Sequence, residues 1–263
     1  MIVNTRRLFT RLLPRMQINT VCDVGSMDGA DALAFSDAVP QASIYAFEPN
    51  PANFRRMEAE RAFGERNIEL LPLAVTNYNG EAEFFVVEAD YSNSDPRRGM
   101  SSLHRRTGEW APTTVVPVRT TRLDTCLADR CPSPMRLALW IDTEGKAYEV
   151  VEGARALAGQ VYLLHAEVET SPCIGSGQIF YPQVKSLVEQ LGLAEVATDQ
   201  APSHLQFNAL FVRRDLPAGM RIRLNICLVR ARVRYLLARV VGWLCPACLR
   251  RYQAVRLPAA CSG

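Results

Sequence analysis

The sequence lacks a long hydrophobic run. Charged residues interrupt every stretch of about 18–20 residues, which is the length that a membrane-spanning helix requires. The first 16 residues contain four arginines and no extended apolar segment, a pattern that does not fit a secretory signal. We therefore expect neither a membrane span nor a signal sequence. We interpret residues 4–16 as a short amphipathic helix with Leu8, Leu12 and Leu13 facing inward.

The chain also lacks a regular cysteine framework. Its eight cysteines are scattered, and Cys22 lies within a predicted buried strand, which favours reduced thiols in a cytoplasmic protein over disulfides. Cys245 and Cys248 form one CxxC pair, but a structural zinc site needs a second pair of ligands, and the sequence offers none. We therefore expect no disulfide framework and no zinc site.

Acidic residues are absent from residues 216–263, which contain nine arginines. The whole chain has 30 basic and 27 acidic residues, so residues 1–215 carry 21 basic and 27 acidic residues, a net charge of −6. We predict that these two parts are a globular domain (1–215) and a basic helical tail (216–263). Such charge asymmetry favours an anionic partner for the tail.

Within residues 1–215, strand and helix patterns alternate. Short apolar runs predict strands, and helical spacing between them predicts helices. This order favours an α/β fold with a largely parallel sheet and helices on both of its faces. The predicted strands are residues 20–24, 43–47, 68–75, 81–87, 115–122, 137–141, 161–168 and a closing hairpin of 193–198 with 205–212; the predicted helices are 31–39, 50–63, one that ends at 157, and 183–191; residues 91–113 are expected to form a polar loop.

A glycine-rich turn follows the first predicted strand. Asp23, Gly25 and Gly29 form a DxGxxxG pattern, and the GxGxxG pattern of dinucleotide-binding folds is absent. Glycine permits positive φ and a close approach of the backbone to a ligand. Asp23 could accept a hydrogen bond from the ammonium of a zwitterionic ligand, whereas Asp23 and Asp28 would repel a pyrophosphate. Taken alone, both glycines could be simple turn residues.

Glu48 ends the second predicted strand, about twenty residues after the turn. A carboxylate at this position can accept hydrogen bonds from both hydroxyls of a ribose. By topology, Ala74 near the end of the third strand lies beside the base of the same ligand. The turn and Glu48 together favour a binding site for a cofactor with a free ribose diol.

Carboxylates also mark the ends of the predicted strands 137–141 and 161–168. Because ligands bind at the carboxyl ends of parallel strands, Asp142 is expected to face the cleft, where Glu144 and Glu167 could join it. These carboxylates could remove the proton of an acceptor hydroxyl, or they could hold Mg²⁺. Alternatively, Glu144 caps the next helix and the neighbouring lysine is solvated.

One further acid and two histidines lie near these carboxylates or in the polar loop. We expect Glu169 to be a surface acid at a strand end. His165 lies in a predicted buried strand, and we interpret it as a core histidine. His104, in the polar loop, is the histidine whose role in catalysis we would test.

Seven segments of the chain resemble, in order, the FkbM family of methyltransferases. They cover roughly residues 19–170 with the spacing of that family. The resemblance implies a class I methyltransferase fold that uses S-adenosylmethionine to methylate a hydroxyl of a glycan, a lipid-linked sugar or a small natural product. The segments are CDVGSMDGADALAF, IYAFEPNPANFRRM, LPLAVTNYNGEAEFFV, GMSSL, TTRLDTCL, WIDTEGKAYEVVEGA and HAEVET.

The resemblance also implies roles for individual residues. Glu48 would hold the ribose, and Asp142 with Glu144 would face the reacting centre. Ser101 and Ser102 would lie near the cofactor or the acceptor, and we include His104 with them. The residues that would line the methionine end of the cofactor are Asp23, Gly25, Ser26, Met27 and Gly29.

The sequence departs from the family pattern at two places. Ser26 and Met27 replace the usual Ala-Asn, which should alter packing beside the cofactor without removing the site. Ala147 replaces a usual acid. If the usual acid binds a metal or the acceptor, its loss puts activity or substrate choice in doubt and favours the alternative of a non-catalytic binding module. If the usual acid only caps a helix, its loss is harmless. We favour an active enzyme over this alternative and over a nucleotide-dependent oxidoreductase, which the missing GxGxxG disfavours.

The tail has an amphipathic helical pattern over residues 224–244. Its apolar stripe spans about 100° of a helical wheel, with arginines beside it, as in helices that lie on anionic lipid. The protein would then be peripheral on the inner face of the membrane. Alternatively, the stripe packs on the body or on a second subunit of a homo-oligomer. Few aromatic residues lie among the arginines, which argues against nucleic acid. The stripe consists of Ile226, Val229, Val233, Leu236, Leu237, Val240 and Leu244, with Arg221, Arg223, Arg230, Arg232, Arg234, Arg239 and Trp243 outside it and Pro246 at its end.

Overall fold

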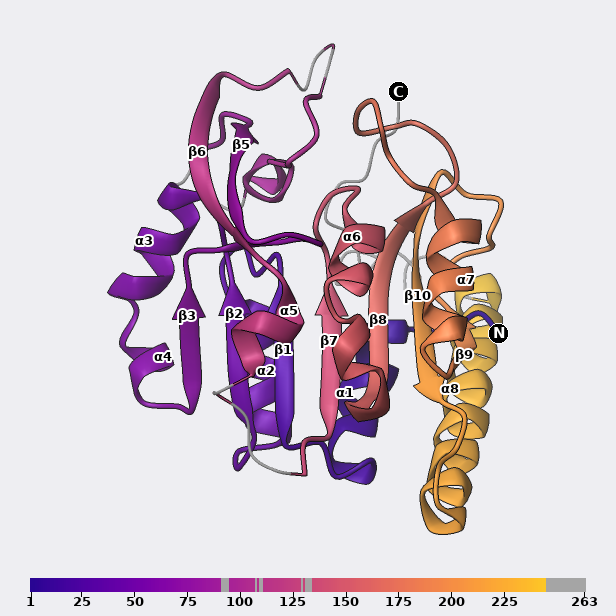
Figure 1. The fold of residues 1–263 in the computed structure, drawn as a ribbon. Coiled ribbons are helices and arrows are strands. Elements are labelled where there is room, and N and C mark those ends of the chain that lie inside the picture. The colour runs from indigo at the N-terminus through magenta and orange to yellow at the C-terminus, as the bar shows by residue number, and fades with distance from the viewer. Residues whose placement is uncertain (91–94, 107, 109–110, 129, 131–133, 245–263) are drawn as a thin grey trace.

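Seven strands form the central sheet, in the order β3-β2-β1-β7-β8-β10-β9 (Figure 1). β1, β2, β3, β7 and β8 run parallel to one another, and β10 is antiparallel to both of its neighbours. This arrangement confirms the expected α/β fold with a largely parallel sheet and a closing hairpin. The strands are β1 (Thr20–Val24), β2 (Ser43–Phe47), β3 (Ile68–Leu71), β7 (Leu137–Ile141), β8 (Val161–Glu169), β9 (Leu193–Thr198) and β10 (Gln206–Arg213).

The computed structural model describes residues 1–90, 95–106, 108, 111–128, 130 and 134–244, without the side chains of Pro96 and of residues 239–244. The cysteines in this part, Cys22, Cys126, Cys173 and Cys227, are reduced, as expected. Cys245, Pro246 and Cys248 lie outside the described residues. None of the described helices is long and apolar enough to cross a membrane.

A second sheet of three strands lies beyond the carboxyl ends of β2 and β3 (Figure 1). Its order is β4-β6-β5, with β5 (Gly80–Val86) antiparallel to β6 (Thr114–Thr121) and β4 (Ala74–Val75) parallel to it. The prediction of one strand over 68–75 is therefore wrong, because the chain changes sheets at Pro72. Proline has no N–H group to continue the ladder of β3.

Helices cover both faces of the central sheet. One apolar layer contains α1 (Thr5–Arg15), α2 (Ala30–Ala38), α3 (Pro51–Ala59), α4 (Arg61–Gly64) and α8 (Ala218–Leu244). The other contains α5 (Leu123–Leu127), α6 (Ala147–Glu152), the 3₁₀ helix η3 (Arg155–Gln160) and α7 (Tyr181–Gln190). A further 3₁₀ helix, η1 (Pro96–Gly99), lies in the predicted polar loop.

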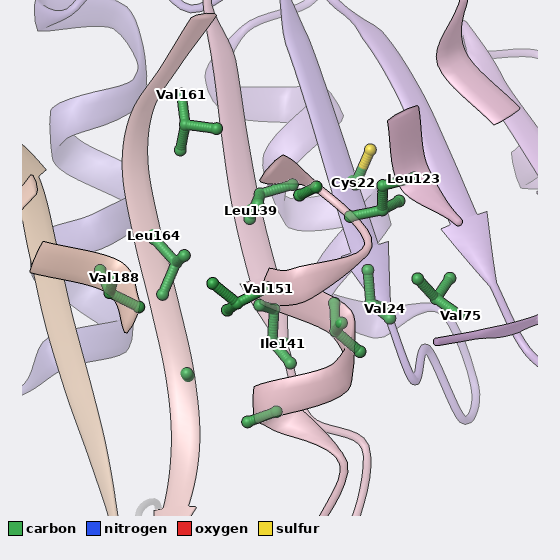
Figure 2. Close-up of a cluster of buried hydrophobic side chains, with 14 of the residues drawn as sticks. Cys22, Val24, Val75, Leu123, Leu139, Ile141, Val151, Val161, Leu164 and Val188 are labelled. Atoms are coloured by element: carbon green, nitrogen blue, oxygen red, sulfur yellow. The ribbon is translucent and has the colours of Figure 1, made fainter. Parts of the chain in front are cut away.

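Each central strand contributes to both layers. In β7, Leu139 and Ile141 pack against α6, and Figure 2 shows them beside Val151 and Leu164. The alternate residue, Trp140, belongs to the layer on the other face. β7 is buried along its whole length, as expected for a parallel strand that is covered on both sides.

Two predicted helices are shorter than expected. The helix predicted over 50–63 breaks at Glu60, which has an extended backbone between α3 and α4. The helix after β7 ends at Glu152. The next residue, Gly153, lies against the backbone of the segment after β4: a Cβ atom there would lie 2.2 Å from the carbonyl oxygen of Thr76. The short helix α5 was not predicted.

An aromatic cluster attaches α1 to the sheet. The ring of Phe9 lies 5.2 Å from those of Phe35 and Trp140, and Trp140 stacks on His165 at 3.6 Å. His165 Nε2 also shares a 3.0 Å hydrogen bond with Oγ1 of Thr5. His165 is 1% exposed, as expected for a core histidine. The predicted inward side of α1 is confirmed as well, since Leu8, Leu12 and Leu13 are buried.

Replacing Phe9 with alanine should lower the free energy of unfolding by about 3–5 kcal/mol, because the cavity left between α1 and the sheet cannot refill. Urea unfolding measures this change. Leu205, which is 61% exposed, provides the control: Leu205→Ala should change the stability by less than about 0.5 kcal/mol. Similar losses for both variants would contradict the anchoring role of the aromatic cluster.

Candidate active site

The strand register brings four segments to one edge of the central sheet. Val24 pairs with Phe47 of β2 and with Ile141 of β7, and Ile141 pairs with Ala166 of β8. These strands therefore end at the same level. The residues that follow the paired positions are Gly25, Glu48, Asp142 and Glu167.

A cavity of about 1020 Å³ opens at this edge of the sheet. It is large enough for a cofactor with its acceptor, since ligand sites commonly measure about 300–1,000 Å³. Most of the sequence-predicted site residues line it: Asp23, Gly25, Ser26, Met27, Glu48, Ala74, Ser101, Asp142, Glu144 and Glu167. Gly29, Ser102 and His104 are not part of the lining.

The turn after β1 is held against the end of β7. Gly25 has a φ of +88°, and a Cβ atom at this position would lie 1.8 Å from the carbonyl oxygen of Asp142. The N–H groups of Gly25 and Ser26 both donate to the carbonyl oxygen of Phe47 at 3.0 Å. Glycine is therefore required for the close approach of the backbone, and not only for its conformation.

Asp23 lies beneath this turn and is 1% exposed. Ser26 Oγ donates to Asp23 Oδ2 at 2.8 Å. Burial raises the pKa of Asp23 well above its ordinary value, with a further contribution from the charge of Asp31. A cationic group placed in the cavity would restore the ionised form of Asp23 and would be held by it.

Hydrogen bonds from the turn after β1 and from the start of α3 fix Glu48 at the end of β2. Its carboxylate accepts hydrogen bonds from the N–H groups of Met27 at 2.6 Å and Asn50 at 2.8 Å, and from Nδ2 of Asn53 at 3.4 Å. Burial raises the pKa of Glu48 to about 7. The bond to Glu48 also holds Met27 at a φ of +53°.

Carboxylates from β7 and β8 gather on the opposite side of the cavity. One oxygen each of Asp142, Glu144 and Glu167 lies within 4.8 Å of the others. Burial, together with the charges of Asp142 and Glu144, raises the pKa of Glu167 well above its ordinary value. Glu167 therefore holds a proton and donates a hydrogen bond to Asp142; burial raises the pKa of Asp142 as well, and this hydrogen bond lowers it. The side chain of Asp142 is accessible from the cavity.

Two polar side chains that the sequence analysis did not single out complete this cluster. Arg106, only 7% exposed, forms an ion pair with Glu144. Gln206 Nε2 donates to Glu167 at 2.7 Å and lies 3.4 Å from a carboxylate oxygen of Glu169. Arg106 lies in a loop with several arginines, and Gln206 begins β10, so neither position carries a motif.

The carboxylate cluster corrects two expectations. Glu169 is 2% exposed, so its interpretation as a surface acid is wrong, and burial raises its pKa to about 7. Glu144 does not cap α6, which begins after Lys146, and burial raises the pKa of Glu144 to about 8. Lys146 is not simply solvated, because it pairs with Glu149 at 2.8 Å.

Three predicted site residues support the cavity wall from behind. Ser102 Oγ donates to the carbonyl oxygen of Glu144 at 2.7 Å, and His104 Nε2 lies 3.2 Å from that of Gly145. Burial lowers the pKa of His104. A Cβ atom on Gly29 would lie 2.4 Å from the ring of Phe63. These contacts favour positioning roles for all three residues rather than direct contact with a ligand.

The raised carboxyl pKa values should make the ligand-free protein less stable as the pH rises. Glu48, Glu144 and Glu169 titrate at about 7, 8 and 7 in the folded chain, against 4.5 ordinarily. The folded state binds more protons between these values, so its stability is full below pH 4.5 and falls as the pH passes through 7–8. His104 and His165, whose pKa values are lowered, act in the opposite direction only below pH 6.5.

Urea unfolding at pH 6.5 and pH 8 tests this prediction, since the histidines no longer contribute there. The free energy of unfolding should be lower at pH 8. Glu169→Gln should reduce the difference, whereas the control Glu69→Gln, at an exposed carboxylate, should keep it. A stability that is constant or rises over this range would contradict the described electrostatics.

The chain is similar to several known proteins. The chain is 25% identical over 158 residues to the 2-O-methyltransferase NoeI of Sinorhizobium fredii, a match that covers 56% of this chain and 62% of that protein. The chain thus spans less than two thirds of the relative's length. Among solved structures, it resembles the N-terminal domain of EvdMO1 with SAH bound, at 15% identity and a TM-score of 0.43, covering 80% of each chain. It also resembles a precorrin-6y C5,15-methyltransferase from Geobacter metallireducens GS-15, at 13% identity and a TM-score of 0.38, covering 77% of this chain and 86% of that one.

The family comparison covers more than half of the chain. The sequence profile described as "Methyltransferase FkbM domain" matches residues 23–179. This range begins at Asp23, at the glycine-rich turn, and includes Asp142, Glu144 and Glu167. The chain therefore contains a methyltransferase FkbM domain and belongs to the FkbM family.

Proposed function

We propose that this enzyme transfers the methyl group of S-adenosylmethionine to a hydroxyl oxygen of a sugar, a glycan or a small natural product. One observation carries the proposal: the glycine-rich turn with Glu48 and the carboxylate cluster of Asp142 open into the same cavity. The first set suits the cofactor, and the second suits an acceptor that must lose a proton. S-adenosylmethionine supplies an electrophilic methyl group on a sulfonium.

The cofactor side of the cavity fits S-adenosylmethionine in charge and shape. Asp23 offers a buried carboxylate to the ammonium of the methionine portion, and Glu48 offers its remaining lone pairs to the ribose hydroxyls. Leu73 and Ala74 line the same cavity as Glu48 and give it an apolar wall, which suits the adenine. We assign Gly25, Ser26 and Met27 to the methionine end because they join these two acids.

On the acceptor side, Asp142 is the residue placed to accept a proton. Its carboxylate is accessible from the cavity, and its backbone carbonyl lies next to Gly25, at the methionine end of the proposed cofactor site. Glu167 donates to Asp142, and Gln206 donates to Glu167, so two hydrogen bonds fix the direction of the Asp142 carboxylate. Positioning of this kind favours in-line attack by an acceptor oxygen.

The composition of the acceptor side favours a neutral polyol. Asp142 would repel an anionic acceptor, whereas sugar hydroxyls can donate hydrogen bonds to carboxylates and to amide oxygens such as that of Asn208. The curated relative is named a 2-O-methyltransferase, which supports oxygen as the acceptor atom. A non-catalytic role gains no support from Ala147, because this side chain is buried in the core beneath α6.

The carboxylate cluster also has the oxygen donors that Mg²⁺ prefers. Its charge is already offset within the protein, by Arg106 on Glu144 and by the proton of Glu167. We therefore propose proton transfer to Asp142 without a metal. Activity that persists in EDTA supports this proposal; activity that is lost in EDTA and restored by Mg²⁺ replaces it with a metal site formed by Asp142, Glu144 and Glu167.

Glu48→Gln should weaken the binding of S-adenosylhomocysteine at least about tenfold at pH 8, because an amide is a weaker acceptor for the ribose hydroxyls than a carboxylate. In the unchanged enzyme, binding should also weaken as the pH falls below about 7, where Glu48 becomes protonated. Calorimetric titration measures both effects, with Glu69→Gln as the control. Affinities that are the same for Glu48→Gln and the control would remove Glu48 from the site.

Asp142→Asn should lower the rate of methyl transfer by about 10²–10⁴-fold, the usual contribution of a general base. Its affinity for S-adenosylhomocysteine should change far less, because Glu48 and the turn remain. The assay measures S-adenosylhomocysteine release with a panel of sugars and phenols, and mass spectrometry locates the methyl group. A variant as active as the wild type would exclude Asp142 as the base, and a product methylated on nitrogen or carbon would overturn the proposed reaction.

A further inference from the structure

Helix α8 exposes a continuous row of apolar side chains, which we call the outer ridge. These side chains are 47% to 62% exposed, although large aliphatic residues are usually buried. Most of the large exposed apolar residues in the described part of the chain belong to the outer ridge. It consists of Ile222, Ile226, Val229, Val233, Leu236 and Leu237.

The outer ridge is not the face with which α8 packs on the protein. Met220, Leu224 and Cys227 are buried against α1 and the sheet, and Leu228 and Tyr235 are partly buried there. At about 100° per residue, this packed face is centred opposite the outer ridge. The predicted stripe therefore does not pack on the body. The predicted members Val240 and Leu244, with Arg239 and Trp243, lie outside the described side chains.

Exposed arginines border the outer ridge on both sides. On the same helical wheel, Arg223, Arg230 and Arg234 follow one flank, and Arg221 and Arg232 follow the other. Within the described part of the chain, no ion pair joins any of these five arginines to an acid. An apolar ridge thus stands between two rows of uncompensated positive charge.

Helix α1 extends this positive charge. α8 packs beside α1, and burial together with the charges of Arg7, Arg234 and Arg15 lowers the pKa of Arg11. Like charges therefore gather across the two helices. Anionic groups at this surface would relieve the repulsion.

We propose that α8 binds the surface of an anionic lipid bilayer, with the outer ridge in the interfacial region and the flanking arginines at the phosphate headgroups. Apolar side chains between rows of arginine match both parts of such a surface. The helix is 27 residues and therefore about 40 Å long, and it would lie along the bilayer rather than cross it.

Charge favours a bilayer over a second copy of this chain. If two outer ridges packed together, the arginine rows of both copies would face one another, and α8 has no acidic residue to pair with them. A bilayer with anionic headgroups offers the opposite charge along both flanks. Figure 1 shows α8 at the outer edge of the molecule, beyond β9 and β10, where a flat surface can reach it.

Membrane binding at α8 would also orient the cavity. Asn4, the N-cap of α1, and the first helical residues Thr5 and Arg6 line the cavity, and α1 is the helix on which α8 packs. A bound bilayer would therefore stand beside the wall of the cavity that α1 forms. The proposal for α8 does not rest on the identity of the methyl acceptor.

Sedimentation with lipid vesicles tests the proposal on the full chain. The protein should bind vesicles of phosphatidylcholine with phosphatidylglycerol and should bind vesicles of phosphatidylcholine alone far more weakly. Ile226→Glu, Val233→Glu and Leu237→Glu combined should weaken the binding at least about tenfold, because the apolar contact is lost. Vesicle binding should weaken by about fivefold in each of the single variants Arg223→Gln, Arg230→Gln and Arg232→Gln. High salt should weaken vesicle binding as well.

The matched control introduces the same charges at exposed apolar residues outside α8. Tyr78→Glu, Val115→Glu and Leu205→Glu combined should bind vesicles like the wild type, and circular dichroism should show that both triple variants are folded. Failure of the wild type to bind anionic vesicles overturns the proposal, as does binding that survives the outer-ridge variant. A dimer in lipid-free solution that this variant dissociates would assign the outer ridge to a second copy instead.

Discussion

The close approach of β1 and β7 at the carboxyl edge of the sheet is the constraint on which the site depends. At Gly25 the backbone lies so near the Asp142 carbonyl that any side chain would enter the Asp142 backbone. This contact joins two sites of different chemistry. On one side are the turn and Glu48, which we propose to bind the ribose, and on the other is the carboxylate cluster. In-line methyl transfer requires these sites to be adjacent, and the parallel register of β2, β1, β7 and β8 makes them so.

The burial of several carboxylates around one cavity costs free energy, because each carboxylate loses its hydration. The protein reduces this cost with one arginine and one shared proton. Arg106 pairs with Glu144, while Glu167 keeps its proton and donates a hydrogen bond to Asp142. The repulsion that remains among the carboxylates destabilises the ligand-free protein. A cofactor with an ammonium and a sulfonium relieves it, so the same electrostatics that lower the stability favour the binding of this particular cation.

Sequence reasoning succeeded where one physical rule connects a pattern to a position. Parallel strands place the residues that follow them at one edge, so Gly25, Glu48 and Asp142 could be expected to meet before their distances were known. It failed where the outcome depends on contacts distant in the sequence. Arg106 and Gln206 reach the cluster from a loop and from β10, which carry no motif, and Glu169 is buried at the end of β8, where it pairs with Gln206. In α8, periodicity found the apolar stripe, but only packing shows that the opposite face, with Leu224, meets the body.

The structure of the protein with S-adenosylhomocysteine bound tests the central claim most directly. The account predicts that both ribose hydroxyls donate to Glu48 and that the sulfur lies beside Gly25, facing the carboxylate of Asp142. A ligand whose ribose contacts other groups, or whose sulfur points away from Asp142, would contradict the claim that the register of β1 and β7 joins the cofactor site to the base.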